Sequence, residues 1–376
     1  VIVHNGLLAM LAHDIYMDLI KPRPCDREDY CLKIASKLMK YASSSLYLSS
    51  FTEQELDDME NELDTLFKEL KDVLKEQINI TSWLDEESRN IMLDKLSNMT
   101  IMVPSSRSIL LNSKFLNSYF LNNLNFTTHF DNAIELLRQG RNHLYSHVGI
   151  NTSEPEAMLF FSLPSDIHPI SVYELNTVFI PYGMVGSRRL ASDLPSYVLK
   201  ARVGNEIARQ IVHHFDTTGV KYNAIGKDDA FLKGKSNDSY VKNYITCEEV
   251  NDNHNYSWIN QRNNKYIYQV NAARTMNEHI TDNSALWLTY KLYNKTAESE
   301  PFLPWLNMNH GELYLLLVAQ EFCAKAELLD YIATMFETEH SPPHLRVKKM
   351  IENSALFEDV YKCKSRPKCG AFPREI

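Results

Sequence analysis

Two pairs of polar side chains in the second half of the sequence have the spacing of catalytic or metal-binding residues. Arg209 and His213 lie four positions apart in ARQIVHHFD, and Glu278 and Asp282 lie four positions apart in NEHITDN. Residues four apart project from one face of an α-helix. A zinc peptidase has two histidines at this spacing, with a general-base glutamate beside the first, and a further ligand on a second helix. The spacing of such a site is therefore present, while most of its chemistry is missing.

These residues also have ordinary structural explanations. His213 and His214 could form a half-buried pair, and carboxylates four apart are common on solvated helix faces. Arg346, followed by Lys348 and Lys349, could belong to a basic surface turn. No single residue decides between these alternatives, so the choice depends on the segments around them.

The elements that carry these residues are predicted to be mainly helical. Thr52 and Glu55 form a capping-box pattern before a long segment whose apolar residues recur at three- and four-residue steps. A second helix is predicted after Asp85. Later helices are predicted over 197–215, 266–293 and 311–336. The segment SVYELNTVFIPYG alternates weakly and turns at Pro181 and Gly183, which predicts a strand or hairpin.

Composition excludes several classes of function. The chain has 376 residues, 11 glycines and a net charge of -9, so it is neither a glycine-rich nucleotide fold nor a binder of nucleic acid. Its amphipathic opening segment, 1–20, contains charged residues, and no uncharged apolar stretch is long enough to span a membrane. Because the first residue is Val, a signal peptide or anchor would lie upstream. Seven Asn-x-Ser/Thr sequons favour a secreted protein.

Six segments in order resemble the neprilysin and endothelin-converting-enzyme family of zinc metallopeptidases. They are LLAMLAHDIYMDLI, TSWLDEESRNIMLDKL, NTVFIPYG, HHFDTTGVKYNAIG, NEHITDNSALWLTYKLY and HSPPHLRVKKMIENSALFEDVYKC. Together they resemble roughly the C-terminal half of that family's ectodomain. The resemblance implies a mainly α (α+β) fold. We expect a helical lobe over 1–135, then a thermolysin-like metallopeptidase domain over 136–376 with a small sheet beside the active-site helices.

The resemblance implies that several groups of the family's site are lost. Arg209 stands at the first zinc-histidine position, and Gln210 stands at the general-base position. The substrate clamp, Asn-Ala-(aromatic) in the family, falls at His168, Pro169 and Ile170. A guanidinium repels Zn²⁺, and a glutamine amide does not accept a proton at neutral pH. Metal binding, base catalysis and substrate recognition are therefore each weakened.

The resemblance implies that five other positions are retained. His213 matches the second zinc histidine, Glu278 the glutamate ligand, and Asp282 the aspartate that orients a ligating histidine. His340 matches the histidine that stabilises the transition state, and Arg346 matches the arginine that hydrogen-bonds the substrate carbonyl.

We therefore hypothesise that Arg209 takes over the charge of the metal by pairing with Glu278 and with Asp282. An alternative alignment with the family, over residues 204–209, keeps the glutamate but lacks both zinc histidines and requires an inserted turn. The alignment without a gap, which places Arg209 and His213 at the histidine positions, is therefore preferred.

The six cysteines also follow the resemblance. It implies a disulfide between Cys247 and Cys369, and it places the usual partners of three others upstream of this chain. The remaining four are Cys25, Cys31, Cys323 and Cys363. Two substitute pairs are possible, Cys25 with Cys31 and Cys323 with Cys363.

Three functions are considered, of which the resemblance implies the first two. The leading one is an inactive neprilysin-like ectodomain that binds extracellular peptides or partner proteins, secreted or at the plasma membrane. The competing one is an active zinc endopeptidase of extracellular peptides, and the third is a structural or dimerising module. The Arg209–Gln210 pair favours the first. No cofactor is then expected, with Zn²⁺ required only by the second, and neither nucleic acid nor membrane contact is expected.

Overall fold

The computed structural model describes residues 12, 27–103, 107–119, 124, 128–149, 155–189, 194–230, 232–247, 255–259, 265–296, 305–325, 335, 338–362 and 369–373. The predicted opening helix lies outside these residues, apart from position 12. The chain forms two compact units. Unit 1 comprises Val1–Leu56, Pro104–Ile167 and Pro181–Gly183, and unit 2 comprises Asp57–Val103, His168–Ile180 and Met184–Ile376. Both units are discontinuous in sequence, whereas we predicted one boundary after residue 135, and that boundary stays a prediction.

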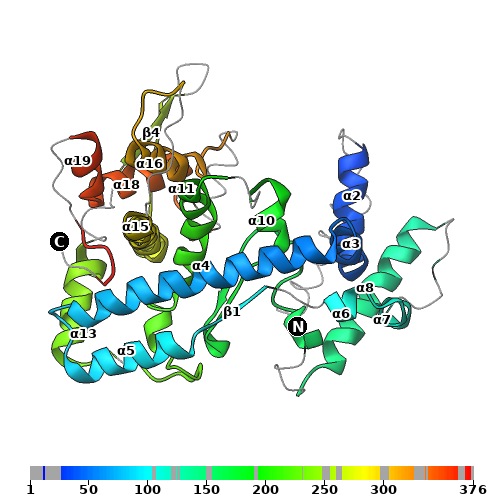
Figure 1. Ribbon diagram of the computed structural model, residues 1–376. Coiled ribbons are helices and arrows are strands. Elements are labelled where there is room, and N and C mark those ends of the chain that lie inside the picture. Colours follow the sequence, from blue (N-terminus) through cyan, green and yellow to red (C-terminus); the bar gives the residue numbers. More distant parts are fainter. Residues whose placement is uncertain are drawn as a thin grey trace. The chain divides into compact units, whose positions relative to one another are not determined.

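Unit 1 is built from short helices. They are α2 (Arg27–Leu38), α3 (Lys40–Leu48), α6 (Arg107–Leu110), α7 (Ser113–Tyr119), α8 (His129–Ser146) and α9 (Pro155–Met158) (Figure 1). The fully buried ring of Tyr41 lies with its centroid 6.0 Å from that of Phe115 and 5.5 Å from that of His143. Gly183 comes so close to this unit's backbone that a Cβ there would lie 2.3 Å from the carbonyl oxygen of Asp166. Only glycine fits at that position.

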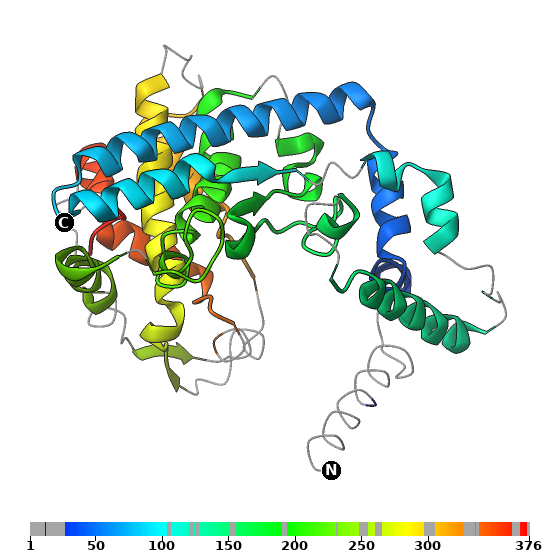
Figure 2. The ribbon, with the colours of Figure 1, turned by 90° about the horizontal axis from the view of Figure 1, so that it is seen from below.

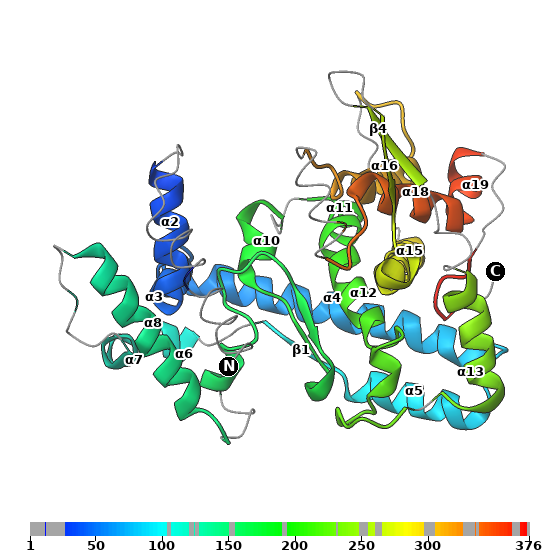
Figure 3. The ribbon, with the colours of Figure 1, turned by 180° about the vertical axis from the view of Figure 1, so that it is seen from behind.

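The first helices of unit 2 follow the sequence prediction. In α4 (Glu53–Ile80) the capping box is confirmed, since Thr52 Oγ1 accepts from the Glu55 amide at 3.2 Å and Glu55 Oε2 accepts from the Thr52 amide at 2.8 Å. Helix α5 (Glu86–Asn98) begins after Asp85, which caps the Ser88 amide. The apolar stripe of α4 is buried, at Leu56, Leu63, Leu66, Phe67, Leu70, Leu74 and Ile78. Helices α4 and α5 run side by side (Figure 3).

A three-stranded sheet in the order β1-β3-β2 lies beside these helices. Strand β1 (Thr100–Met102) pairs in parallel with β3 (Thr177–Phe179), and β2 (Ile170–Val172) pairs antiparallel with β3. The predicted strand or hairpin is present as the pair β2–β3, but the chain does not reverse at Pro181 and Gly183 as predicted. Its reversal passes through a short 3₁₀ turn and Asn176, whose φ is 49°. Strand β1 falls within the stretch predicted to be a purely helical lobe, and three residues are too few to show a strand period.

The helices of the second half correct two predictions. Residues 266–269 form strand β5 (Lys265–Gln269), paired with β4 (Asn255–Ile259), and α15 (Ala272–Thr296) begins only afterwards. Their alternating aromatic and β-branched residues fit a strand better than a helix. Helix α16 (His310–Gln320) ends well before residue 336, because the amides of 321–323 bond carbonyls three positions earlier and tighten the last turn. The helix predicted over 197–215 is present as α11 (Ser196–Leu199), a π turn and α12 (Asn205–His213).

The long helices of unit 2 cross steeply. Figure 1 views α15 end-on while α4 lies across the picture, and Figure 2 shows the same crossing from below. The described residues also form the helices α10 (Tyr182–Arg189), α13 (Gly234–Tyr240), α18 (Pro343–Asn353) and α19 (Leu356–Tyr361). Among the helices of the described residues, none has the length and hydrophobicity needed to cross a bilayer.

A disulfide joins Cys247, which follows α13, to Cys369 near the C-terminus. This confirms the pairing implied by the family resemblance. The substitute pairs are not formed, since Cys31 and Cys323 carry free, exposed thiols. Residues 369–373 belong to unit 2 and are largely buried in it, and Phe372 stacks on Phe215 with ring centroids 5.6 Å apart.

Removing this disulfide should destabilise the protein. Its cysteines are 122 residues apart, so the bond restricts a long loop of the unfolded chain. We expect a Cys247→Ser, Cys369→Ser double variant to lose about 2–5 kcal/mol of unfolding free energy in urea denaturation. The matched control is Cys31→Ser, Cys323→Ser, which should change it by less than about 0.5 kcal/mol. Equal losses in the two double variants would contradict the assigned bond.

Candidate functional site

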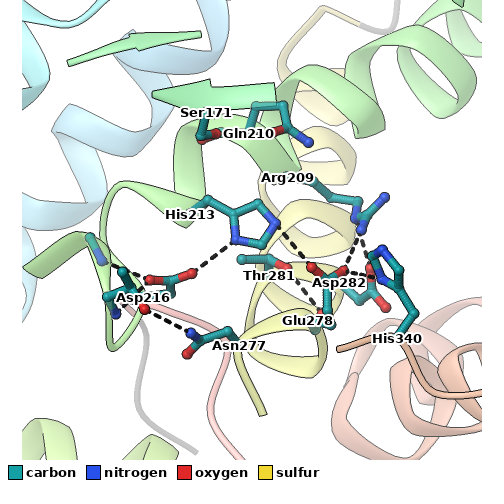
Figure 4. Close-up of polar contacts among 12 residues, drawn as sticks. Ser171, Arg209, Gln210, His213, Asp216, Asn277, Glu278, Thr281, Asp282 and His340 are labelled. Carbon is teal, nitrogen blue, oxygen red and sulfur yellow. Dashed lines mark hydrogen bonds and ion pairs between the residues drawn. The ribbon is translucent and has the colours of Figure 1, made fainter. Parts of the chain in front are cut away.

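Three helices of unit 2 bring the predicted site residues together. Helix α12 carries Arg209 and His213, next to the buried apolar residues of the same helix. Helix α15 packs against α12 and carries Glu278 and Asp282. Helix α18 packs on α15 and contributes Arg346, while His340 lies in the segment just before it. Figure 4 shows the α12 side chains facing those of α15. We call Arg209, His213, Glu278, Asp282, His340 and Arg346 the central cluster.

Arg209 points at the carboxylates, as hypothesised from the sequence. Its Nη2 donates to Glu278 Oε2 at 2.7 Å, and its Nε lies 2.9 Å from Asp282 Oδ1 as an ion pair without hydrogen-bond alignment. Its Nη1 lies 3.2 Å from Glu206 Oε2, three residues earlier on the same helix. Burial opposes the charge on Arg209, but these three carboxylates outweigh it and raise the pKa of the guanidinium. Arg209 is therefore fixed as a buried cation.

Arg346 supplies the second buried cation. Its Nε and Nη2 donate to the two oxygens of Asp282, each at 2.6 Å, and Nη2 also donates to Glu278 Oε2 at 3.1 Å. Its Nη1 lies 3.3 Å from Nδ1 of His340. This fork-to-carboxylate geometry is the strongest kind of side-chain ion pair. The donors expected to bind a substrate carbonyl are therefore largely engaged by the protein itself.

Glu278 is the carboxylate that most members of the cluster share. Besides the two arginines, His340 Nδ1 lies 3.0 Å from its Oε2, and His213 Nε2 lies 3.5 Å from its Oε1. Burial by itself raises the pKa of Glu278. The hydrogen bond from His340 and the charges of Arg209, His213 and Arg346 outweigh that effect and lower the pKa well below its usual range. Glu278 is therefore an ionised, fully engaged carboxylate.

Two acidic residues that sequence reasoning did not assign to the site support it. Asp216 Oδ2 accepts from His213 Nδ1 at 2.9 Å, while its Oδ1 accepts the amides of Thr218 and Gly219, each at 2.8 Å. Asp216 thus fixes the ring of His213 and the turn after α12. Glu206 pairs with Arg209 as described above. Both carboxylates lie three residues from their partner, and that spacing was the available signal.

The other two predicted residues lie outside the cluster. Gln210 is buried and turned toward β2, where the Ser171 hydroxyl lies 2.9 Å from both its Oε1 and its carbonyl oxygen (Figure 4). His168 is exposed, two residues before β2. Among the contacts of the described residues, none joins His168 to the central cluster. Within the described residues, His168 at the expected clamp position therefore makes no contact with the central cluster.

The residues present do not fit a catalytic zinc ion. Zinc in such sites has three protein ligands and one open position. In the described part of the chain, no three histidine, cysteine or carboxylate groups of the central cluster bring ligand atoms together. His213 and Glu278 are the retained ligand positions, and Arg209 donates to the same carboxylate that a metal would need. The donor set is that of a salt-bridge network.

Comparisons with known proteins agree with this fold. Models of peptidase family M13 match residues 171–373 and 12–104. Neprilysin-2 of Caenorhabditis elegans is 27% identical over 203 residues, covering 53% of this chain and 26% of that protein. Membrane metallo-endopeptidase-like 1 of Homo sapiens is 24% identical over 344 residues, covering 89% of this chain and 42% of that protein. The chain thus spans less than half the length of these curated relatives.

Solved structures show the same architecture. A zinc metalloprotease of Mycobacterium tuberculosis in complex with an inhibitor superimposes with a TM-score of 0.71 at 18% identity, covering 94% of this chain and 52% of that one. The Haemonchus galactose containing glycoprotein complex gives a TM-score of 0.73 at 19% identity, covering 98% of this chain and 56% of that one. The helical fold with a small sheet is therefore confirmed.

Removing Arg209 should be costly because it leaves buried carboxylates short of positive charge. We expect Arg209→Met to lose about 3–5 kcal/mol of unfolding free energy in urea denaturation. The control, Arg138→Met, removes an arginine whose pair with Glu135 is exposed, and it should lose no more than about 1 kcal/mol. Adding Glu278→Met to Arg209→Met should cost less than the two single losses combined. Additive losses would contradict a direct pair.

The central cluster should also make stability pH-dependent. The pKa of Glu278 is lower in the folded protein than in the unfolded chain, where it is about 4.3. The unfolded state therefore binds the proton more readily, so this stabilisation is complete above that pH and is lost as the pH falls below it. The unfolding free energy of Glu278→Gln, measured by urea denaturation from pH 7 to pH 3.5, should fall less steeply than that of the wild type. Parallel curves would contradict this assignment.

Proposed function

The chain belongs to peptidase family M13, and we propose that it is a member that does not hydrolyse peptides and instead binds extracellular peptides or proteins. The observation that carries this proposal is the contact of Arg209 with both buried carboxylates of α15, Glu278 and Asp282. Arg209 stands where the family resemblance implies a zinc histidine. Because the family's activity is metal-dependent, the residue at that position decides between a peptidase and a binding protein.

Charge balance supports a cluster that functions without a metal. Glu278 and Asp282 contribute two buried negative charges, and Arg209 and Arg346 contribute two positive ones, joined by contacts of 2.6–3.1 Å. A buried carboxylate is stable only when it is paired and hydrogen-bonded. A divalent ion added here would meet the Arg209 guanidinium on the same oxygen of Glu278. Zinc binding would therefore require Arg209 to give up its pairs and leave the site.

The group at the base position supports the same proposal. A general base must accept a proton in the transition state, and a neutral amide does not. Gln210 Oε1 is in addition within hydrogen-bonding distance of the Ser171 hydroxyl. Glu206, one turn earlier on α12, lies beside Arg209 as its counter-charge. The side chains around α12 thus stabilise charge and bind neither a metal nor a proton from water.

Two features of unit 2 are suited to binding a peptide. Strand β2 ends the sheet order β1-β3-β2, so in the described part of the chain one of its edges has no strand partner. An extended peptide can add to such an edge through main-chain hydrogen bonds. His340, with a half-exposed side chain, lies at the central cluster and could contact a bound peptide there. His168 stands at the family's clamp position and lacks the side-chain amide that could both donate to a peptide backbone and accept from it.

Two features support an extracellular location, and therefore partners that are extracellular peptides or proteins. The sequence carries seven sequons, and the Cys247–Cys369 bond is of a kind that persists in oxidising compartments. We place this chain in an extracellular protein, secreted or held at the plasma membrane. We assign it no cofactor at the central cluster.

The proposal is tested by restoring the family's residues. We expect the wild-type chain to show no zinc-dependent cleavage of a peptide library. We expect the Arg209→His, Gln210→Glu double variant to bind one more equivalent of Zn²⁺ than the wild type and to gain cleavage that a chelator blocks. A general base contributes about 10²–10⁴-fold to such a rate. The Arg209→His single variant should therefore gain zinc but cleave at least about 100-fold more slowly than the double variant.

Two readouts make the outcome decisive. Cleavage by the wild type that a chelator abolishes would overturn the proposal and favour an active endopeptidase. Peptide capture is measured with the same library immobilised, and binding to the wild type that is weakened by a charge-reversing His340→Glu substitution supports the binding function. Absence of any peptide or protein capture by a well-folded chain would favour a purely structural module.

A further inference from the structure

A group of potential metal-ligating side chains lies in unit 1 and includes no member of the central cluster. His143 and His147 are four positions apart on α8, so both imidazoles project from one face of that helix. Glu156 on α9 faces them. The three side chains are 13%, 15% and 35% exposed, which makes them partly buried yet reachable from solvent. Within the described residues, this is the one group of three such side chains whose ligand atoms converge.

The distances match a metal's coordination shell. His143 Nε2 lies 3.6 Å from Glu156 Oε1, and His147 Nε2 lies 3.5 Å from the same oxygen. The three ligand atoms all lie within 4.8 Å of one another. Zinc–nitrogen and zinc–oxygen bonds of about 2.0–2.1 Å at tetrahedral angles place neighbouring ligand atoms about 3.3–3.4 Å apart. The two separations that involve Glu156 are therefore within a few tenths of an ångström of this value, and the separation of the two histidine nitrogens is at most 4.8 Å.

The ring of His147 is already oriented for a metal. Its Nδ1 lies 2.9 Å from the carbonyl oxygen of His143, and because a carbonyl only accepts, Nδ1 carries the proton. Neutral His147 then has its lone pair on Nε2, the atom that faces Glu156. A ligating histidine commonly donates its other N–H to a carbonyl or a carboxylate, which fixes tautomer and ring plane. This second contact points to a ligand rather than to a simple charge pair.

Aromatic packing holds both rings in place. The centroid of the Phe160 ring lies 5.4 Å from that of His143 and 5.2 Å from that of His147. The two imidazoles lie 4.5 Å apart, and Tyr41 contacts His143 edge-on. A site whose rotamers are locked by packing loses little entropy on binding. Two imidazolium cations at this separation would repel each other, so pairing of both with Glu156 alone is the weaker explanation of their arrangement.

We propose that His143, His147 and Glu156 form a binding site for one divalent transition-metal ion, with Zn²⁺ as the best fit. Two imidazoles and a carboxylate suit Zn²⁺, Ni²⁺ or Cu²⁺, whereas Ca²⁺ and Mg²⁺ prefer all-oxygen sites. Three protein ligands leave the fourth position to water or to a donor from a partner. The ion joins α9 to α8 and thereby stabilises unit 1.

One charged neighbour opposes the ion and offers a variant that strengthens binding. Lys40 Nζ lies 5.5 Å from the centroid of the Phe160 ring and 4.9 Å from that of Tyr41, close to the histidines. Its ammonium repels a cation. Replacing it by an uncharged side chain of similar length, Lys40→Met, should therefore tighten Zn²⁺ binding.

The experiment is a Zn²⁺ titration of the whole chain by isothermal calorimetry at pH 7.5, with Co²⁺ as a spectroscopic probe. We expect one equivalent to bind to the wild type and the Co²⁺ form to show the strong visible absorption of a four-coordinate ion. Glu156→Gln and His147→Gln should each weaken binding by at least about 100-fold, more than the loss of an outer-shell contact. Lys40→Met should strengthen it by several-fold.

Matched controls separate this site from the central cluster. His213→Gln and Glu278→Gln, which alter the retained zinc positions, should leave this equivalent unchanged. Loss of the equivalent in His213→Gln with retention in His147→Gln would overturn this proposal and the proposed function together. Absence of Zn²⁺ binding by a wild-type chain with a normal melting curve would overturn this proposal alone. Each variant's melting temperature in chelator confirms that lost binding is not lost folding.

Discussion

Two carboxylates buried one turn apart on α15 set the main electrostatic constraint of unit 2. Glu278 and Asp282 have only 6% and 1% of their surface exposed, and no stable fold leaves such a pair without positive charge. In a metallopeptidase site, a metal ion and its histidines meet that need. Here Arg209 and Arg346 meet it from two different helices. The packing of α12 and α18 on α15 therefore serves charge balance as well as hydrophobic burial.

A guanidinium and a zinc ion satisfy the same carboxylates with different consequences. Zinc polarises a bound water and leaves a coordination position open, whereas Arg209 uses its donors on Glu278 and Asp282 and has no Lewis acidity. Under the proposed function, this replacement keeps the scaffold and removes the metal-dependent chemistry. Asp216 contacts His213 and Ser171 contacts Gln210, so the side chains next to Arg209 on α12 are held by further polar contacts.

Sequence reasoning succeeded where the signal was local or repeated along the chain. The stripe and capping box of α4, the cap of α5 and the hairpin at β2 and β3 all follow patterns of a few residues, and all are present. It failed where two patterns compete over a short stretch. Residues 266–269 alternate as a strand does but directly precede a long helical pattern, and pairing with β4 makes them a strand. The end of α16 has no glycine or proline to mark it, so the helix was predicted too long.

The sequence by itself determined the family resemblance, the presence of arginine and glutamine at positions 209 and 210, and the Cys247–Cys369 pairing that the resemblance implies, because these depend on residue identity at matched positions. Only the tertiary structure decided what these side chains contact. That Arg209 reaches Glu278, and that Asp216 holds His213, depend on side-chain direction at helix contacts. The convergence of His143, His147 and Glu156 depends on how α9 lies against α8, which no spacing rule encodes. Arg209 and Glu278 are 69 positions apart in the chain, and for the residues that lie closer together spacing alone does not show that their side chains meet, because that depends on side-chain direction in the folded chain.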